Sequence, residues 1–234
     1  MTMSDDPIQI LIPSMGRADT ITSHVLFRES YVYVPESEAD QYEERFKWML
    51  ENSASRRVFF CDDDIKYVQE LYRITEEGKV TQKKITDPDH IMEILENSAH
   101  ICAEIGAHFW SFDDNPNPAK YLSTLPFRLR KRGSTAYGGI LKDGLTWGFD
   151  PRFATKADMD FYLMCLVKDR IIWADYRYVF VGDAYENRGG CTELRTIQRE
   201  VEETKLLQQK YGTDIVRVKK DNPLKMTFGT GGAL

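Results

Sequence analysis

Short apolar runs alternate with polar segments along the first quarter of the chain. The runs IQILIP, YVYVP and RVFFC each stop at a proline or a polar turn, as buried strands do. Between the second and third runs, Tyr42, Phe46, Met49 and Leu50 recur at helical spacing behind an acidic first turn. Strands that alternate with a helix predict an α/β fold with a mostly parallel central sheet flanked by helices.

The rest of the chain continues this alternation. DPDHIMEILENSAHICAEIG predicts a helix with an Asp-Pro start and Gly106 as its stop. AHFWSF, STAYGGILKDG and IIWADYRYVFV predict further strands. TKADMDFYLMCLVKDR predicts a helix capped by Thr155 or Asp158, and the stretch 192–211 has the charge pattern of an exposed amphipathic helix. The glycine-rich tail KMTFGTGGAL is expected to fray.

Length and composition indicate a single globular domain. The 234 residues are 42% hydrophobic and 12% aromatic, and no linker rich in Pro, Gly or Ser divides them. We expect a core over about 8–212 and a tail over 213–234. The four cysteines form no CxxC pair, and neither a signal peptide nor a membrane-spanning stretch is visible. These features predict a cytoplasmic protein with reduced thiols and no membrane partner.

The net charge of -6 argues against a protein that coats nucleic acid through charge alone. One stretch, PFRLRKRGS, is nevertheless strongly basic. Either it is a solvated loop, or it contacts phosphates. Its cationic residues are Arg128, Arg130, Lys131 and Arg132.

Three consecutive acids follow the apolar run RVFF and Cys61. In parallel α/β sheets ligands bind at the carboxyl ends of the strands, where Asp62, Asp63 and Asp64 are expected. In extended backbone Asp62 and Asp64 share a face while Asp63 points away. A divalent cation, Mg²⁺ or Mn²⁺, relieves the repulsion between two such carboxylates. The alternative is an acidic turn or the N-terminal cap of a helix over IKYVQELY.

A second acidic pair, Asp158 and Asp160, lies in KADMDF where a long helix begins. Acids at that position either cap the helix or supply a general base for an acceptor hydroxyl. The chain contains no GxSxG, Walker A or GxGxxG motif, so esterase, P-loop and dinucleotide-binding classes lose their main support.

The order ILIPSMGR, FFCDDDI and KADMDF resembles the GT-A fold, nucleotide-sugar-dependent glycosyltransferases, whose domain is Rossmann-like. Within that superfamily, IPSMGRADT, YVYVPESEADQY and WMLENSASRRVFFCDDDI are most similar to the TET-associated, phage-type enzymes. Those are associated with sugar addition to hydroxymethylated pyrimidines in DNA. The similarity covers roughly residues 8–195.

The resemblance implies roles for particular residues. It makes Asp62 and Asp64 the ligands of Mn²⁺ or Mg²⁺ and Asp158 the base, while Asp160 supports the base or the acceptor. A DNA acceptor would place its phosphates at the cluster 128–132. Aromatic residues such as Trp110, Tyr137 and Trp147 either line an acceptor pocket or belong to the core. The residues implied to contact the nucleotide sugar are Pro13, Ser14, Gly16, Arg17, Asp63, Arg188, Gly189 and Gly190.

Two departures from the family pattern keep other functions open. Ala157 stands where the family has a Glu before the base, and the segment between Tyr42 and Trp48 is short for the family. The alternatives are a glycosyltransferase with a small-molecule, glycan or protein acceptor, a non-catalytic nucleotide- or metal-binding module, and a metal-dependent phosphotransferase or nuclease.

Overall fold

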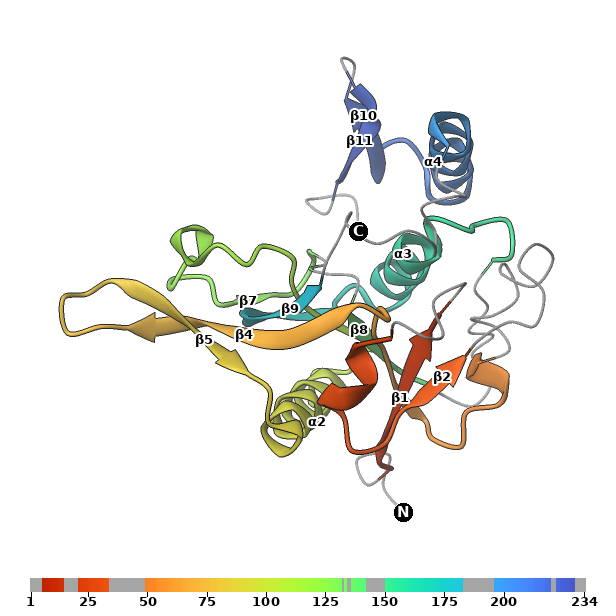
Figure 1. Cartoon of the computed structure of the whole chain (residues 1–234). Coiled ribbons are helices and arrows are strands. Elements are labelled where there is room, and N and C mark those ends of the chain that lie inside the picture. The colour runs from red at the N-terminus through yellow and green to blue at the C-terminus, as the bar shows by residue number, and fades with distance from the viewer. Residues whose placement is uncertain are drawn as a thin grey trace.

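The computed structural model describes residues 6–14, 21–33, 49–131, 133, 136–141, 150–182, 196–219 and 222–229. Within them, nine strands form one large sheet in the order β2-β1-β3-β8-β6-β9-β4-β5, with β7 also paired to β9 (Figure 1). The strands of this sheet are β1 (Ile8–Pro13), β2 (Tyr31–Tyr33), β3 (Arg57–Phe60), β4 (Ile65–Ile74), β5 (Val80–Ile85), β6 (Phe109–Asp113), β7 (Phe127–Arg128), β8 (Tyr137–Ile140) and β9 (Trp173–Gly182).

The remaining elements are helices and a separate two-stranded sheet. They are η2 (Ser23–Leu26), α2 (Pro88–Glu104), η3 (Pro118–Lys120), α3 (Ala157–Asp169), α4 (Ile197–Tyr211), β10 (Val216–Lys219) and β11 (Asn222–Phe228).

The α/β class is confirmed, but the large sheet is mixed rather than mostly parallel. The pairs β1/β2, β1/β3 and β6/β9 are parallel, and the other pairs are antiparallel. One reason is that β4 follows β3 after only four residues, whereas a parallel crossover needs a dozen or more. The pairings nevertheless make β1, β2, β3, β6, β9 and β5 run in one direction, so β1, β3 and β6 end at the same edge.

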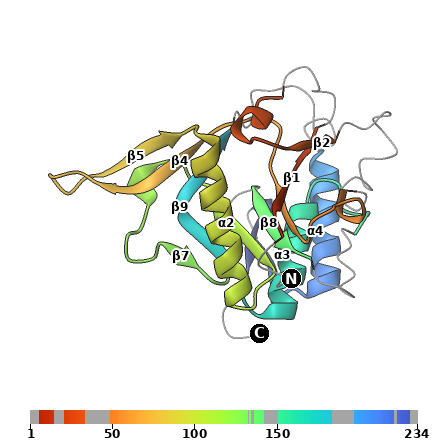
Figure 2. The same cartoon turned by 90° about the horizontal axis from the view of Figure 1, so that it is seen from below.

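Helices cover both faces of the sheet. Figure 2 shows α2 on one side and α3 with α4 on the other. Because strand side chains alternate between faces, Phe59 of β3 packs in the core under α2, and Phe60 packs in the core under α3. Trp110 and Tyr137 are 0% and 2% exposed and belong to these cores, so the hypothesis that they line an acceptor pocket is wrong. Trp147 lies outside the described residues.

Local signals account for α2 but not for the start of α3. Asp87 caps α2 by accepting from the Asp89 N–H at 3.2 Å, and Gly106 follows the helix with φ 75°, as predicted. The N-cap of α3 is Lys156, which makes no side-chain capping bond. The prediction of Thr155 or Asp158 as cap is therefore wrong.

Two hairpins depart from the sequence expectations. IKYVQELY lies in strand β4, not in a helix, and β4 pairs with β5 in a long hairpin that projects from the body in Figure 1. β10 and β11 pair near the C-terminus, so part of the tail expected to fray is a strand. Met226 and Phe228 of β11 pack against the core under α3.

Among the described helices, none has both the length and the apolar character that crossing a bilayer requires. Cys61, Cys102 and Cys165 are buried free thiols. Burial raises the pKa of all three thiols, which makes them poor nucleophiles.

Candidate active site at the carboxyl edge of the sheet

The acidic triplet lies directly beyond β3, but its backbone does not stay extended. Asp63 and Asp64 form a turn, in which Asp62 is exposed, Asp63 is buried and Asp64 is half-buried. Simple strand alternation therefore does not set the direction of these side chains. The turn leaves Asp62 and Asp64 the more accessible carboxylates and takes Asp63 into the protein.

Asp63 contacts the loop that follows β1. The Ser14 hydroxyl donates to Asp63 Oδ2 at 2.7 Å, and both residues are buried. β1 and β3 are parallel neighbours with Leu11 opposite Phe60, and the Cys61 N–H donates to the Leu11 carbonyl at 3.1 Å. The pairing of the two strands thus brings together two residues, Ser14 and Asp63, that were predicted to lie beside the donor nucleotide.

The short helix η2 holds the main chain of the acidic turn. The Asp63 carbonyl accepts from the N–H groups of Thr22 and Ser23 at 2.9 and 3.3 Å. The Ser23 hydroxyl donates to the Asp62 carbonyl and accepts from the Ile65 N–H at 2.9 Å. Thr22 Oγ1 donates to the Ile65 carbonyl at 3.1 Å. Because the backbone is fixed on both sides of the acids, their carboxylates start from defined positions.

Asp64 packs against the end of β9, where Gly182 pairs with Ile65. A Cβ added to Gly182 would lie 2.7 Å from Asp64 Oδ1 and 3.0 Å from the Asp64 carbonyl oxygen. Real Cβ atoms essentially never come within 3.0 Å of another heavy atom. Glycine at position 182 therefore leaves room for the Asp64 side chain.

Asp113, at the end of β6, is a further acid at this edge. Tyr137 of β8 pairs with Phe60 of β3 on one side and with Ser111 of β6 on the other, so Phe60 and Ser111 lie at the same height in the sheet. Asp62 follows Phe60 by two positions, and Asp113 follows Ser111 by two positions. Burial raises the pKa of Asp113 to about 6, although the N–H groups of Asn115 and Asp114 oppose this shift. Asp113 is not among the predicted site residues. Its signal was the same as that of the triplet, acids directly after the apolar run AHFWSF.

Asp158 lies in the first turn of α3 and is half-buried. The other end of α3 is tied to the start of β6, because His108 Nδ1 lies 2.7 Å from Asp169 Oδ2 and the His108 N–H donates to the same oxygen at 3.1 Å. Figure 1 shows the N-terminal end of α3 on the side toward which β1 runs. The helix thus directs its first turn toward the edge that carries the other acids.

Asp160 is 1% exposed and is bound by α4. Lys210 Nζ lies 2.8 Å from its carboxylate, and the Tyr211 hydroxyl donates to Oδ1 at 2.6 Å. Burial, followed by the charge of Asp160, raises the pKa of Tyr211, so this hydroxyl remains a donor. These contacts favour a supporting role for Asp160 over that of a proton acceptor.

The basic cluster lies on and after β7. Arg128 is half-buried with its Cζ 4.9 Å from the centre of the Tyr176 ring, while Arg130 and Lys131 are exposed. The Arg130 carbonyl accepts from the Tyr162 hydroxyl of α3 at 2.8 Å. Large apolar side chains precede these cations or alternate with them, and they are 36% to 54% exposed: Leu122, Leu125, Phe127 and Leu129.

Several predicted site residues lie outside the part of the chain that the structure describes. Pro13, in contrast, is described: it is the last residue of β1, beside Ser14. The segment between Tyr42 and Trp48 is also outside. The predicted site residues that are not described are Gly16, Arg17, Arg132, Arg188, Gly189 and Gly190.

The described acids suit a cation shared between protein and substrate. Within the described ranges, no three His, Cys, Asp or Glu side chains form a group that could hold a metal ion by themselves. Mg²⁺ generally uses one or two carboxylates, substrate phosphates and water rather than a cage made of protein alone. Asp62 is exposed and Asp64 is half-buried, so these two carboxylates are the candidates for such a shared site.

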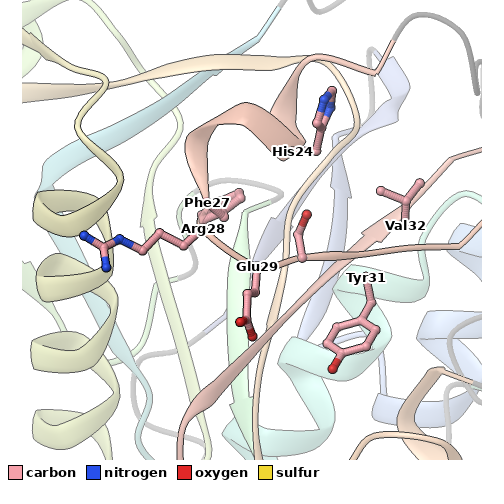
Figure 3. A pocket seen from close by; sticks show the side chains of 7 residues that line it. His24, Phe27, Arg28, Glu29, Tyr31 and Val32 are labelled. Carbon is pink, nitrogen blue, oxygen red and sulfur yellow. The ribbon is translucent and has the colours of Figure 1, made fainter.

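A shallow hollow lies beside η2 and β2. Its lining includes His24, Phe27, Glu29 and Tyr31. In Figure 3 Arg28 points away toward α2, where it forms an ion pair with Asp89. Since η2 also holds the acidic turn, the hollow and the turn share one structural support.

No protein-family model matches the chain, and no curated protein matches it either. Among solved structures, the chain is similar to A197 from STIV, with 14% sequence identity and a TM-score of 0.40. The similarity covers 74% of this chain and 83% of that one. A similarity of this size identifies neither a family nor a function.

Proposed function

We propose that the chain is a metal-dependent glycosyltransferase that transfers a sugar from a nucleotide-sugar donor to a hydroxyl acceptor. The observation that carries this proposal is the acidic turn at the carboxyl edge of the sheet, held by η2 and joined to β1 through the 2.7 Å Ser14–Asp63 hydrogen bond. Such an edge is where α/β sheets bind ligands. The motif order of the sequence agrees with this function.

The donor end of the site consists of Ser14 and the three acids. Asp62 and Asp64 would hold Mn²⁺ or Mg²⁺, and Asp63, buried against Ser14, would lie near the ribose. When bound, the cation supplies neutralisation of the charge on the departing diphosphate. The fixed backbone around the turn then limits how far the carboxylates must move as donor binds.

The acceptor end requires a group that takes up a proton. The bond between the anomeric carbon and the diphosphate oxygen breaks, and the acceptor oxygen forms the new bond to that carbon. The hydroxyl proton passes to Asp158, and the nucleoside diphosphate leaves with the electron pair of the broken bond. Asp160, held by Lys210 and Tyr211, supports the helix turn that carries Asp158.

We further propose that the acceptor is a hydroxymethylated pyrimidine in DNA. The support is the resemblance to phage-type enzymes, together with the basic residues Arg128, Arg130 and Lys131 among exposed apolar side chains. Cations hold phosphates, and apolar or aromatic side chains contact bases that leave the stack. Substitutions that remove the charges of Arg130 and Lys131 should make the affinity for DNA depend less steeply on salt concentration.

A glycosyltransferase with a small-molecule, glycan or protein acceptor is the second candidate. The net charge of -6 favours it, because a negative surface opposes association with DNA. Transfer assays on hydroxymethylated DNA, oligosaccharides and peptides separate the two candidates. Transfer to DNA that weakens steeply with salt supports the DNA acceptor, and salt-independent transfer to another acceptor supports the second candidate.

The donor half of the proposal is tested by thermal unfolding with a panel of sugar nucleotides, with and without Mn²⁺. Specific binding stabilises the folded state by mass action, so one donor should raise Tm in the presence of the metal. Asp64→Ala should keep the wild-type Tm without ligand and lose this increase. An equal increase in Asp64→Ala would show that the donor binds elsewhere.

A further inference from the structure

One face of α4 is directed at the start of α3. Glu200, Glu203, Leu207 and Lys210 recur at helical spacing along this face. Leu207 is buried in the core under α3, and Glu200 forms an ion pair with Lys156. The contact between the two helices is therefore made of charged groups around an apolar centre.

Glu203 is the most heavily bonded side chain of this face. It is 2% exposed, and its Oε2 accepts from Thr155 N at 3.0 Å, Thr155 Oγ1 at 2.9 Å and Lys156 N at 2.9 Å. Its Oε1 accepts from Ala154 N at 3.1 Å and from Arg199 Nε at 3.0 Å. Both carboxylate oxygens are thus used on the three residues that precede α3.

These bonds hold the segment that leads into α3. The N-cap residue Lys156 makes no side-chain capping bond, and N–H groups at a helix start need acceptors. Glu203, 47 positions later in the chain, accepts from the N–H group of this N-cap residue and from the N–H groups of the two residues before it. Its negative charge at a helix N-terminus is also favourable for the helix dipole.

We propose that Glu203 is a positioning residue that fixes the first turn of α3 and thereby places the Asp158 carboxylate for proton transfer. This inference rests on the proposed function, in which Asp158 is the base. Asp158 lies two residues after Lys156, the last backbone donor to Glu203. A shift of about 1 Å in a reacting group can lower a rate about 100-fold.

The test compares Glu203→Gln with Glu202→Gln. Gln keeps one acceptor oxygen and replaces the other by an NH₂ group, which repels the backbone N–H groups on that side. Glu202 is exposed, lies on the same helix and accepts from Gln198 at 2.9 Å, so it is a matched control. The measurements are kcat, the Kd of donor with Mn²⁺, Tm, and hydrogen exchange of the amides of residues 154–156.

For Glu203→Gln we expect faster exchange at residues 154–156, a 10- to 100-fold lower kcat and a donor Kd within about twofold of wild type. Glu202→Gln should match wild type in all four measurements. A kcat within twofold of wild type despite faster exchange would overturn the positioning role. The positioning role would also be overturned if kcat fell only in proportion to the fraction of Glu203→Gln that is folded.

A second variant covers the case in which Glu203→Gln does not fold. Thr155→Val removes only the Thr155 hydroxyl bond to Glu203 and should lower kcat severalfold with donor affinity retained. An unchanged kcat with faster exchange in this variant would overturn the inference. If wild type transfers sugar to no acceptor, the proposed function fails, and the exchange measurement still shows whether Glu203 fixes residues 154–156.

Discussion

The Ser14 hydroxyl and the Asp63 carboxylate form a buried hydrogen bond of 2.7 Å that joins the loops after β1 and β3. Ser14→Ala leaves one lone pair of a buried carboxylate without this donor, so we expect a loss of about 1–3 kcal/mol in the free energy of unfolding. Urea unfolding measures this change, with exposed Ser123→Ala as control. Donor affinity should fall as well, and equal stability of the two variants would contradict the role of this bond.

Gly182 controls the space for Asp64. In Gly182→Ala the new Cβ would meet Asp64 Oδ1 at 2.7 Å, so the carboxylate must move. We expect the variant to fold and to lose most of the Mn²⁺-dependent rise in Tm with donor, whereas the adjacent Val181→Ala keeps it. A full metal response in Gly182→Ala would mean that the position of Asp64 is unimportant for donor binding.

Lys210 provides the charged partner of Asp160. Lys210→Met removes the bond to Asp160 and a longer contact of 3.4 Å with Asp150, and loss of a hydrogen bond to a buried charged group should cost about 1.5–3 kcal/mol. Lys205→Met, on the exposed side of the same helix, serves as the control and should change the free energy of unfolding by less than about 0.5 kcal/mol. Similar values for the two variants would show that the ion pair with Asp160 adds nothing to stability.

Asp113 should make stability depend on pH. Its pKa in the folded protein is about 6 against an ordinary value of 3.8, so the folded state favours the protonated form. The stabilisation from this group is complete below about pH 3.8 and is lost as the pH rises through about 6. Asp113→Asn, which stays neutral, should remove this loss. Urea unfolding at pH 4, 6 and 8 measures how the free energy of unfolding depends on pH. The same pH dependence in wild type and variant would contradict the prediction.

The sequence was sufficient where local signals decide the structure. β1, β3 and α2 follow from apolar runs, Asp87 and Gly106. β4 could not be predicted in this way, because its buried positions include the polar residues Gln69 and Glu70, and register shifts interrupt the alternation of its side chains between the two faces. A two-residue period cannot be read from such a strand.

The sequence predicted which residues lie at the candidate site better than it predicted where their side chains point. The acids after β3 were predicted from their position at a strand end, and Ser14 was implied by the resemblance to GT-A glycosyltransferases. The burial of Asp63 results from a turn, and the bonds at the start of α3 come from Glu203, whose partners are 47 to 49 residues away. Long-range contacts of single side chains leave no periodic signal.

The most direct test of the central claim is mass spectrometry of products from wild type and Asp64→Ala, incubated with sugar nucleotides, Mn²⁺ and hydroxymethylated DNA, glycan or peptide acceptors. Wild type should release nucleoside diphosphate and add the mass of one sugar residue to an acceptor, and both products should vanish in Asp64→Ala or with a chelator. Release of the sugar without transfer, or equal transfer by Asp64→Ala, would contradict the account.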